Sequence, residues 1–380
     1  MSLNDLTAMN PPTSTDPSPT ESAAPDRLGI HILLEAVLAI AFAGALFWLY
    51  LGDSPLTSVV ERDALITAMV PLLLLSIAMA VSLRVGAVNL ACGAVAVAGA
   101  VMFAENSGRG MAVAVLAAVG VAVAIGLVLS LLVVALRVPA WLASAVVASV
   151  ILLWVFQRVT IAQLSSDPLP PLASSTSWVW LISVAALSIF GGVVAALNGW
   201  RTRLGVCREV NANSRPSDAA SNLVTIGVML MSSLLSGLAG VWIVWTSADG
   251  SIVADGLNPL MVTVFPLATA LLGGTSAFGR RGGILGTLLA ALLLMTVLEL
   301  IDARGWPVHP LWILLAAIVL GFIVTRLVEA LGQPRKAPEP AEPVEESQLD
   351  PLPARQPNGD YEYAAGDIDP YRRYDLDAHR

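Results

Sequence analysis

Few residues of this chain have the types and spacing that catalysis or metal binding requires. Its three histidines, His31, His309 and His379, show no metal-ligand spacing. The single lysine, Lys336, lies outside any G-x-x-x-x-G-K-[ST] pattern, so the chain is not expected to bind ATP through a P-loop. An intramembrane enzyme would need His, Asp or Ser–Lys groups that converge at depth, and the chain lacks them. We therefore expect no catalytic residue, no metal site and no cofactor.

Ionisable residues inside apolar runs would suit a transporter coupled to an ion gradient, because such groups are costly in a membrane and mark ion pathways. Glu35 and Glu299 are the candidates, and each lies near an end of its run. Glu35 follows His31 by four residues, so the two share a helix face and could pair near the interface. The middle runs carry no such group, which argues against a secondary transporter, the alternative function. Cys92 and Cys207 lie in segments expected to be apolar or cytoplasmic, so no disulfide is expected.

The composition is that of an all-α integral membrane protein. Hydrophobic residues make up 56% of the chain and charged residues 13%, whereas about a quarter of a soluble domain is charged. The net charge of −8 is not a global property, because much of the acid lies in the tails. Residues 1–27 and 331–380 are rich in Pro and acidic or small polar residues, so we expect disordered tails around a transmembrane domain at 28–330.

Apolar runs long enough to cross a bilayer predict about ten transmembrane helices. The runs are 28–51, 64–83, 85–104, 111–136, 139–156, 178–197, 224–245, 261–272, 284–301 and 311–328. The second run contains Pro71, which predicts a kink. Ten crossings place both termini in the cytoplasm, together with most arginines, in accord with the preference of basic loops for that side. Only Arg62, Arg109, Arg158 and Arg304 then fall outside.

Small residues mark expected helix contacts. Ser232, Ser236 and Gly240 are spaced by four, as are Gly282 and Gly286, with Gly283 beside them. Such spacing lets two helix backbones approach closely.

The start of the third run, 85–104, is unusual for a membrane helix. Gly86, Asn89, Cys92 and Gly93 interrupt its apolar pattern. Irregular backbone at membrane depth is tolerated only beside protein or water, so these residues suit a translocation path. A tight turn followed by an ordinary helix explains them equally well, and both interpretations stay open.

Residues 198–223 form the largest polar insertion between the runs. Arginines gather here, which predicts a cytoplasmic loop. Ser217 and Asp218 follow Pro216 and favour the start of a short helix.

Several of these segments resemble bacterial ABC-importer permeases of the branched-chain amino acid, ribose and nucleoside group. The stretch GGTSAFGRRGGILG is similar to a C-terminal signature of some sugar permeases, GGTSxxGGxGxxxG, with Arg280 in place of one glycine. Residues 86–93 resemble the pattern G-x-[IV]-D-L-S-x-G, but Asn89 stands for the Asp and Ala91 for the Ser, which leaves the solute class open. The segment RVPAWLASAVV is similar to R-V-P-x-x-x-x-T-L, with Ser144 near the threonine position.

The resemblance implies a permease subunit of an importer in the bacterial cytoplasmic membrane. It performs no chemistry and forms a path for a small polar solute such as a sugar, a branched-chain amino acid or a nucleoside. The implied partners are an ATP-binding subunit, an extracytoplasmic solute-binding protein, a second permease in a homo- or heterodimer, and the lipid bilayer, with no nucleic acid. The implied path residues are Gly86, Asn89, Cys92 and Gly93. The implied residues of the ATPase coupling loop, laid only loosely on the family's pattern, are Asn211, Asn213, Ser217, Asp218, Ala219 and Ala220.

Overall fold

The computed structural model describes residues 28–51, 58–158, 174–213, 218–246, 259–275 and 284–331. These residues are almost entirely helical and contain no strand, as the sequence predicted. Seven of the helices are long and apolar enough to cross a membrane, and two shorter apolar helices accompany them. The chain is therefore a helical, multi-pass membrane protein. Apart from Leu331, the last residue of α11, the predicted tails lie outside the described residues.

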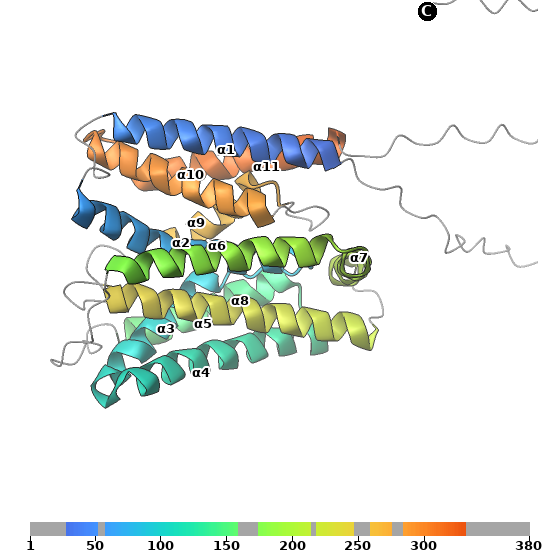
Figure 1. Cartoon of the computed structure of the whole chain (residues 1–380). Helices are drawn as coiled ribbons and strands as arrows, with labels where there is room; N and C mark the ends of the chain where they lie inside the picture. Colours follow the sequence, from blue (N-terminus) through green and yellow to red (C-terminus); the bar gives the residue numbers. More distant parts are fainter. Residues whose placement is uncertain are drawn as a thin grey trace, which may run out of the picture. The chain divides into compact units, whose positions relative to one another are not determined.

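The elements follow one another along the chain as shown in Figure 1. They are α1 (Leu28–Tyr50), α2 (Val59–Arg84), α3 (Cys92–Asn106), η2 (Ser107–Arg109), α4 (Met111–Ser130), the π-helical turn η3 (Leu131–Ala135), α5 (Ala140–Phe156), α6 (Ser174–Ala196), α7 (Asn198–Asn213), α8 (Ala219–Thr246), α9 (Pro259–Leu272), α10 (Ile284–Ala303) and α11 (Pro310–Leu331). Each predicted apolar run coincides with one of these helices. The run at 85–104 becomes helical only at Cys92, because a turn precedes it, and α7 was not predicted.

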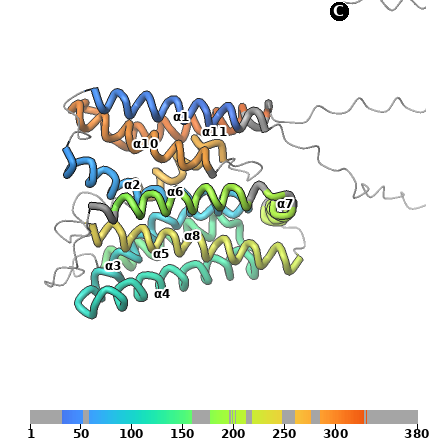
Figure 2. Tube along the Cα trace, viewed as in Figure 1, coloured from blue at the N-terminus to red at the C-terminus, as the bar shows by residue number. Residues whose placement is uncertain are grey.

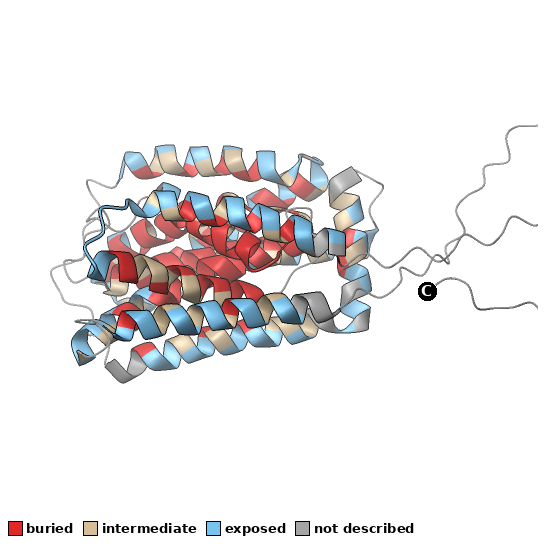
Figure 3. Ribbon diagram, turned by 90° about the horizontal axis from the view of Figure 1, so that it is seen from above, coloured by how far each residue is buried: buried red, intermediate tan, exposed pale blue. Residues whose placement is uncertain are grey.

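The core of the helical unit lies around α8. This helix packs against α2, α3 and α4, while α9 packs against α2, α10 and α11. Figure 3 shows buried residues concentrated in the middle of the bundle and exposed residues along the outer helices. Those outer faces are apolar on α1, α4, α5, α6 and α11. An apolar exterior around a close-packed core is what lipid as the surrounding solvent permits.

Glycines let the central helices approach closely. A Cβ atom on Gly99 of α3 would lie 2.8 Å from the carbonyl oxygen of Gly237 of α8, and one on Gly237 would lie 2.6 Å from the Cβ of Ala122 of α4. Gly240 of α8 packs in the same way on the backbone of Ala96. The crossing of α3, α4 and α8 therefore depends on the absence of side chains.

The predicted packing residues lie at these contacts where the structure describes them. Ser232, Ser236 and Gly240 are buried on α8. Gly286, at the start of α10, packs against the backbone of Gly273 at the end of α9. Gly282 and Gly283 lie outside the described residues.

Pro71 leaves a carbonyl of α2 without its helical partner, and α8 supplies a replacement. A proline has no N–H, so the oxygen four residues earlier, that of Thr67, loses its bond in the helix. The indole Nε1 of Trp242 donates to this oxygen at 2.9 Å. The hydroxyl of Thr67 is hydrogen-bonded to that of Ser177 on α6 at 2.8 Å. The carbonyl and the hydroxyl of Thr67 thus link α2 to α8 and to α6.

Tryptophans gather at one end of the bundle, called here the tryptophan end. Trp48 and Trp306 stack edge to face with ring centroids 5.8 Å apart, and Trp242 contacts both Trp180 and Trp245 at 5.3 and 5.9 Å. Tryptophan is enriched where a membrane protein meets the lipid–water interface. At the opposite end, called the α7 end, helix α7 lies across the ends of the long helices and is seen nearly end-on in Figures 1 and 2.

Candidate functional site in the turn between α2 and α3

The run predicted at 85–104 begins with a turn and becomes helical only at Cys92. Gly86 has φ +70°, a left-handed conformation that side chains other than glycine adopt with difficulty. Its N–H donates to the carbonyl of Leu83 at 3.0 Å, and the N–H of Ala87 donates to that of Ser82 at 3.1 Å. This pair of bonds is the Schellman arrangement that ends helices. Gly86 therefore ends α2, and the chain turns before α3 begins at Cys92.

Asn89 closes this turn and ties it to α8. Its side-chain Oδ1 accepts the N–H of Ala91 at 3.0 Å, and its Nδ2 donates to the Oγ of Ser232 at 3.0 Å. Its own backbone N–H donates to the Oγ of Ser82 at 3.2 Å. The residue has no exposed surface. An amide suits this position because it donates and accepts at once.

A serine of α5 holds the other side of the turn. The Oγ of Ser144 accepts the N–H of Leu90 at 3.0 Å and lies 3.1 Å from the carbonyl oxygen of Val88. Ser144 is the residue that the sequence placed near a family threonine, and a hydroxyl makes these bonds. The turn is therefore fixed between α5 and α8.

The insertion at 198–223 differs from the expected loop. Residues Asn198–Asn213 form α7. The expected helix start after Pro216 is present, but it begins the long helix α8 rather than a short one. Asp218 caps this start, since its Oδ1 accepts the N–H of Ser221 at 3.2 Å. The sequence signal for α7 was the spacing of Trp200, Leu204 and Cys207, which places them on one face of a helix.

Helix α7 is bonded directly to the end of α2. The Nε of Arg208 donates to the carbonyl oxygen of Arg84 at 2.8 Å, and the Nδ2 of Asn211 donates to that of Val85 at 2.8 Å. The last carbonyls of a helix have no partner within it, so these side chains satisfy them. The same amide of Asn211 lies 3.3 Å from the Oγ1 of Thr225 on α8. One side of α7 thus contacts both the interrupted helix and α8.

A groove of about 170 Å³ lies between α7 and the start of α8. It is lined by Thr202, Arg203, Val206, Cys207, Asp218, Ala220, Ser221 and Val224. Burial raises the pKa of the Cys207 thiol, so this sulfur stays protonated and unreactive. The hydrogen bond from Ser221 lowers the pKa of the Asp218 carboxyl, which keeps it ionised at the helix N-terminus.

The structure brings the predicted path residues together in one segment. Gly86 and Asn89 lie in the turn, Cys92 is buried at the start of α3, and Gly93 packs against Thr263 of α9. Asn89, Cys92 and Gly93 are buried, whereas Gly86 is partly exposed.

The predicted coupling residues gather at the α7 end. Asn211 bonds to the end of α2, Asp218 caps α8, and Ala219 and Ala220 form the first turn of α8. Asn213 is the last residue of α7, and Ser217 lies outside the described residues.

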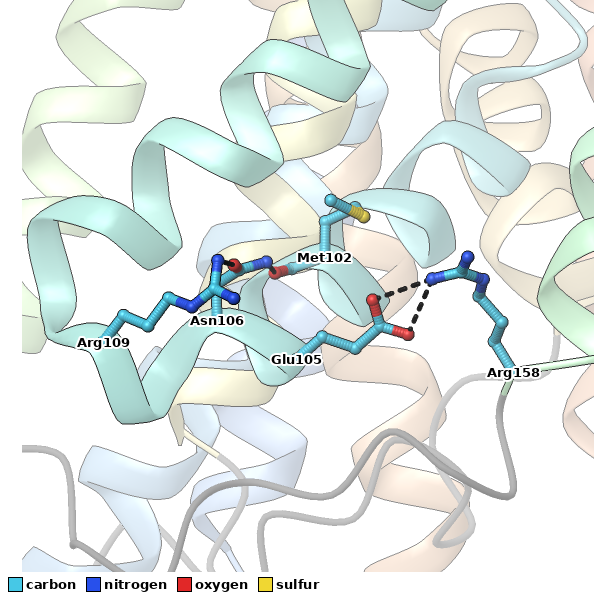
Figure 4. Close-up of polar contacts among 5 residues, drawn as sticks. All are labelled: Met102, Glu105, Asn106, Arg109 and Arg158. Carbon is cyan, nitrogen blue, oxygen red and sulfur yellow. Dashed lines mark hydrogen bonds and ion pairs between the residues drawn. The ribbon is translucent and has the colours of Figure 1, made fainter.

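A polar rim lies at the tryptophan end (Figure 4). Arg158 forms an ion pair with Glu105 at 3.1 Å and lies 5.0 Å above the ring of Trp154. Arg109 donates to the side chain of Asn106 at 3.2 Å. Within the described parts of the chain, no group of three or more His, Cys, Asp or Glu side chains could hold a metal ion.

No protein-family model, curated protein or solved structure matches this chain. Hydrogen bonds from Arg208 and Asn211 join α7, which lies across the end of the bundle, to the end of α2 and the turn that follows it. Such an arrangement can transmit a displacement from the bundle end into the core.

Proposed function

We propose that the chain is the permease subunit of an ATP-binding-cassette importer in the bacterial cytoplasmic membrane. It forms the path of a small polar solute, such as a sugar, a branched-chain amino acid or a nucleoside. Its partners are an ATP-binding subunit, an extracytoplasmic solute-binding protein and a second permease, identical or related. The resemblance of residues 86–93 and 273–286 to that group supports the assignment, as does the absence of catalytic spacing among the residues.

The connection between α7 and α2 is the observation that carries the proposal. Arg208 and Asn211 donate to two successive carbonyl groups, those of Arg84 and Val85, where α2 ends. A subunit that pushed α7 would displace the end of α2, the turn and the residues bonded to Asn89. Alternating access requires such a switch between discrete packings of helices.

In this proposal the α7 end faces the cytoplasm. Arg203 and Arg208 of α7, with Arg84 and Arg137, lie at this end of the helices, and basic segments favour that side. The helices α1–α6 and α8–α11 then cross the membrane ten times, with both termini inside. A cysteine at Ala219 should react with a reagent only from the inside, and one at Gly108 only from the outside. Both positions are exposed.

Residues 211–222 would touch the ATP-binding subunit. The groove beside them offers a concave surface, lined on the α8 side by Asp218, Ala220 and Ser221. A cysteine at Ala219 should crosslink to that subunit. A cysteine at Gly108, at the tryptophan end, is the matched control and should not.

The deciding experiment separates ATP-driven from gradient-driven uptake. The full chain would be reconstituted in vesicles with the ATPase and solute-binding protein from its own source, and labelled sugars, amino acids and nucleosides supplied. We expect uptake that needs ATP, is blocked by vanadate and persists in the presence of an ionophore. Uptake that persists without ATP and collapses with the ionophore would establish a secondary transporter instead.

A further inference from the structure

One face of α7 is buried along most of its length but exposed at its beginning. Trp200, Leu204, Cys207 and Asn211 share this face, at spacings of four, three and four residues. Leu204 and Cys207 are 9% and 1% exposed, and Asn211 bonds to the end of α2. Trp200 is 47% exposed although it points to the same side. The first turn of α7 therefore extends past the helices on which the rest of α7 lies.

The direction of this face identifies what lies beneath Trp200. Its buried members contact the ends of membrane-spanning helices, so the face is turned toward the membrane rather than away from it. Trp141, in the first turn of α5, is 58% exposed at the same end of the bundle. Two exposed tryptophans at the same end of the bundle indicate a lipid–water interface, as the larger group does at the tryptophan end.

Positive charge accompanies Trp200. Residues 198–218 contain four arginines (Arg201, Arg203, Arg208 and Arg215) and two acidic residues (Glu209 and Asp218), which gives a net charge of +2. Arg208 is bonded to the carbonyl of Arg84, whereas the side chain of Arg203 is exposed close to Trp200. Aromatic and basic residues at the start of an amphipathic helix suit binding to a surface of anionic lipid.

We propose that the start of α7, around Trp200, lies in the bilayer interface and binds the headgroups of anionic phospholipids. Trp200 enters the boundary between headgroups and acyl chains, and the exposed Arg203, three residues further on, pairs with a lipid phosphate. Asp218 is no obstacle, because its carboxylate is used by the start of α8. Lipid would therefore anchor one end of α7, while its other end is anchored to α2.

A depth measurement tests the placement of Trp200. Spin labels would be attached to Trp200→Cys and, separately, to Thr202→Cys, which lies two residues on and on the opposite face. In vesicles we expect oxygen to relax the label at 200 more than a water-soluble nickel reagent does, and the reverse at 202. A label at 200 that the nickel reagent reaches as readily as the label at 202 would overturn the proposal.

A second measurement tests the charge of the lipid. The thermal stability of the purified full chain in neutral detergent micelles would be followed as phosphatidylglycerol or phosphatidylcholine is added. We expect a stabilisation that phosphatidylglycerol produces and phosphatidylcholine does not. Arg203→Gln should weaken the apparent affinity for phosphatidylglycerol by about five-fold, the effect of one basic residue near an anionic surface.

Arg109→Gln removes an exposed arginine at the tryptophan end and serves as the control, with an expected affinity equal to that of the unmodified chain. Equal responses to both lipids, or equal losses in both arginine variants, would contradict the proposal. Binding of the ATP-binding subunit to Trp200 in place of lipid would appear as protection of the 200 label only when that subunit is present. None of these readouts depends on transport, so the proposed function can fail while this inference stands.

Discussion

The side-chain amide of Asn89 donates to the Oγ of Ser232 at 3.0 Å, across 143 positions of sequence. This bond joins the turn between α2 and α3 to the middle of α8. The same amide closes the turn through the N–H of Ala91. A movement of α8 relative to α2 would therefore either break this bond or move the turn together with α8.

Replacing Asn89 should destabilise the protein and reduce transport together. Asn89→Leu leaves the N–H of Ala91 without its acceptor in a buried site, at a cost of about 1–3 kcal/mol. Asn89→Asp keeps that acceptor, and the hydroxyl of Ser232 can rotate to donate, so it should lose less. Thermal unfolding in detergent, read beside uptake in vesicles, measures both effects. Loss of uptake in Asn89→Leu at unchanged stability would instead favour direct contact of Asn89 with solute.

Glycines of α8 should differ sharply in their tolerance of a methyl group. Gly237→Ala brings a Cβ to 2.6 Å from the Cβ of Ala122 and forces α8 away from α4. We expect a loss of about 1–3 kcal/mol, as for other overpacked cores. Gly227→Ala, in the same helix, meets no atom within 4 Å and is the matched control. Comparable melting temperatures for the two variants would show that the crossing can relax.

The sequence predicted the helices well because each apolar run is long and bounded by polar residues or turns. It also located the interrupted segment, since Gly86 and Asn89 break an apolar pattern. It missed α7, whose apolar face is narrow and whose composition is that of a polar loop. Only the contacts with the end of α2, through Arg208 and Asn211, explain why this segment is helical where it lies.

Contacts between distant helices could not be predicted from spacing. The sequence suggested that Glu35 pairs with His31 on its own helix, a pairing that stays untested because the side chain of His31 lies outside the described residues. The structure instead brings the carboxyl group of Glu35 close to the backbone of Gly286. Gly286 lies in the first turn of α10, where N–H groups lack partners and favour a carboxylate. No local sequence pattern predicts that a carboxylate of one helix lies beside the start of another.

Trp242 and Pro71 should be energetically coupled. Trp242→Phe removes the donor to the Thr67 carbonyl and should cost about 1 kcal/mol, because that part-buried oxygen then loses its partner. Pro71→Ala restores a backbone N–H in α2 that can bond to the same oxygen. Trp242→Phe should therefore cost less when Pro71→Ala is already present. A double-mutant cycle on unfolding free energies measures the coupling, and additive effects would refute it.

Asp218 should make the start of α8 sensitive to acid. Its pKa is lowered by the hydrogen bond from Ser221, so its contribution to stability is present above the ordinary carboxyl value of 3.8 and is lost as the pH falls through the lowered value. Asp218→Asn can still accept the N–H of Ser221 but does not titrate. The protection of the first turn of α8 against hydrogen exchange, expressed relative to the intrinsic exchange rate at each pH, should fall from neutral to acidic pH in the unmodified chain and change less in Asp218→Asn. Parallel profiles would assign the acid sensitivity to another group.

Breaking the contacts of α7 with α2 should separate ATP hydrolysis from transport. Arg208→Ala together with Asn211→Ala removes the donors to the Arg84 and Val85 carbonyls, whereas the interface proposed for the ATP-binding subunit keeps Asp218, Ala219 and Ala220. We expect the complex to assemble and hydrolyse ATP while the solute taken up per ATP falls several-fold, since a displacement of α7 no longer reaches the turn. The variant Glu209→Gln is the control, because it changes an exposed residue of the same helix. The measurement is the ratio of uptake to hydrolysis in vesicles, beside crosslinking from Ala219 to confirm assembly.

An unchanged ratio in the double variant would mean that the displacement enters the bundle elsewhere, through the start of α8 itself. A loss of crosslinking would mean that these two side chains hold α7 in place for the partner rather than transmit its movement.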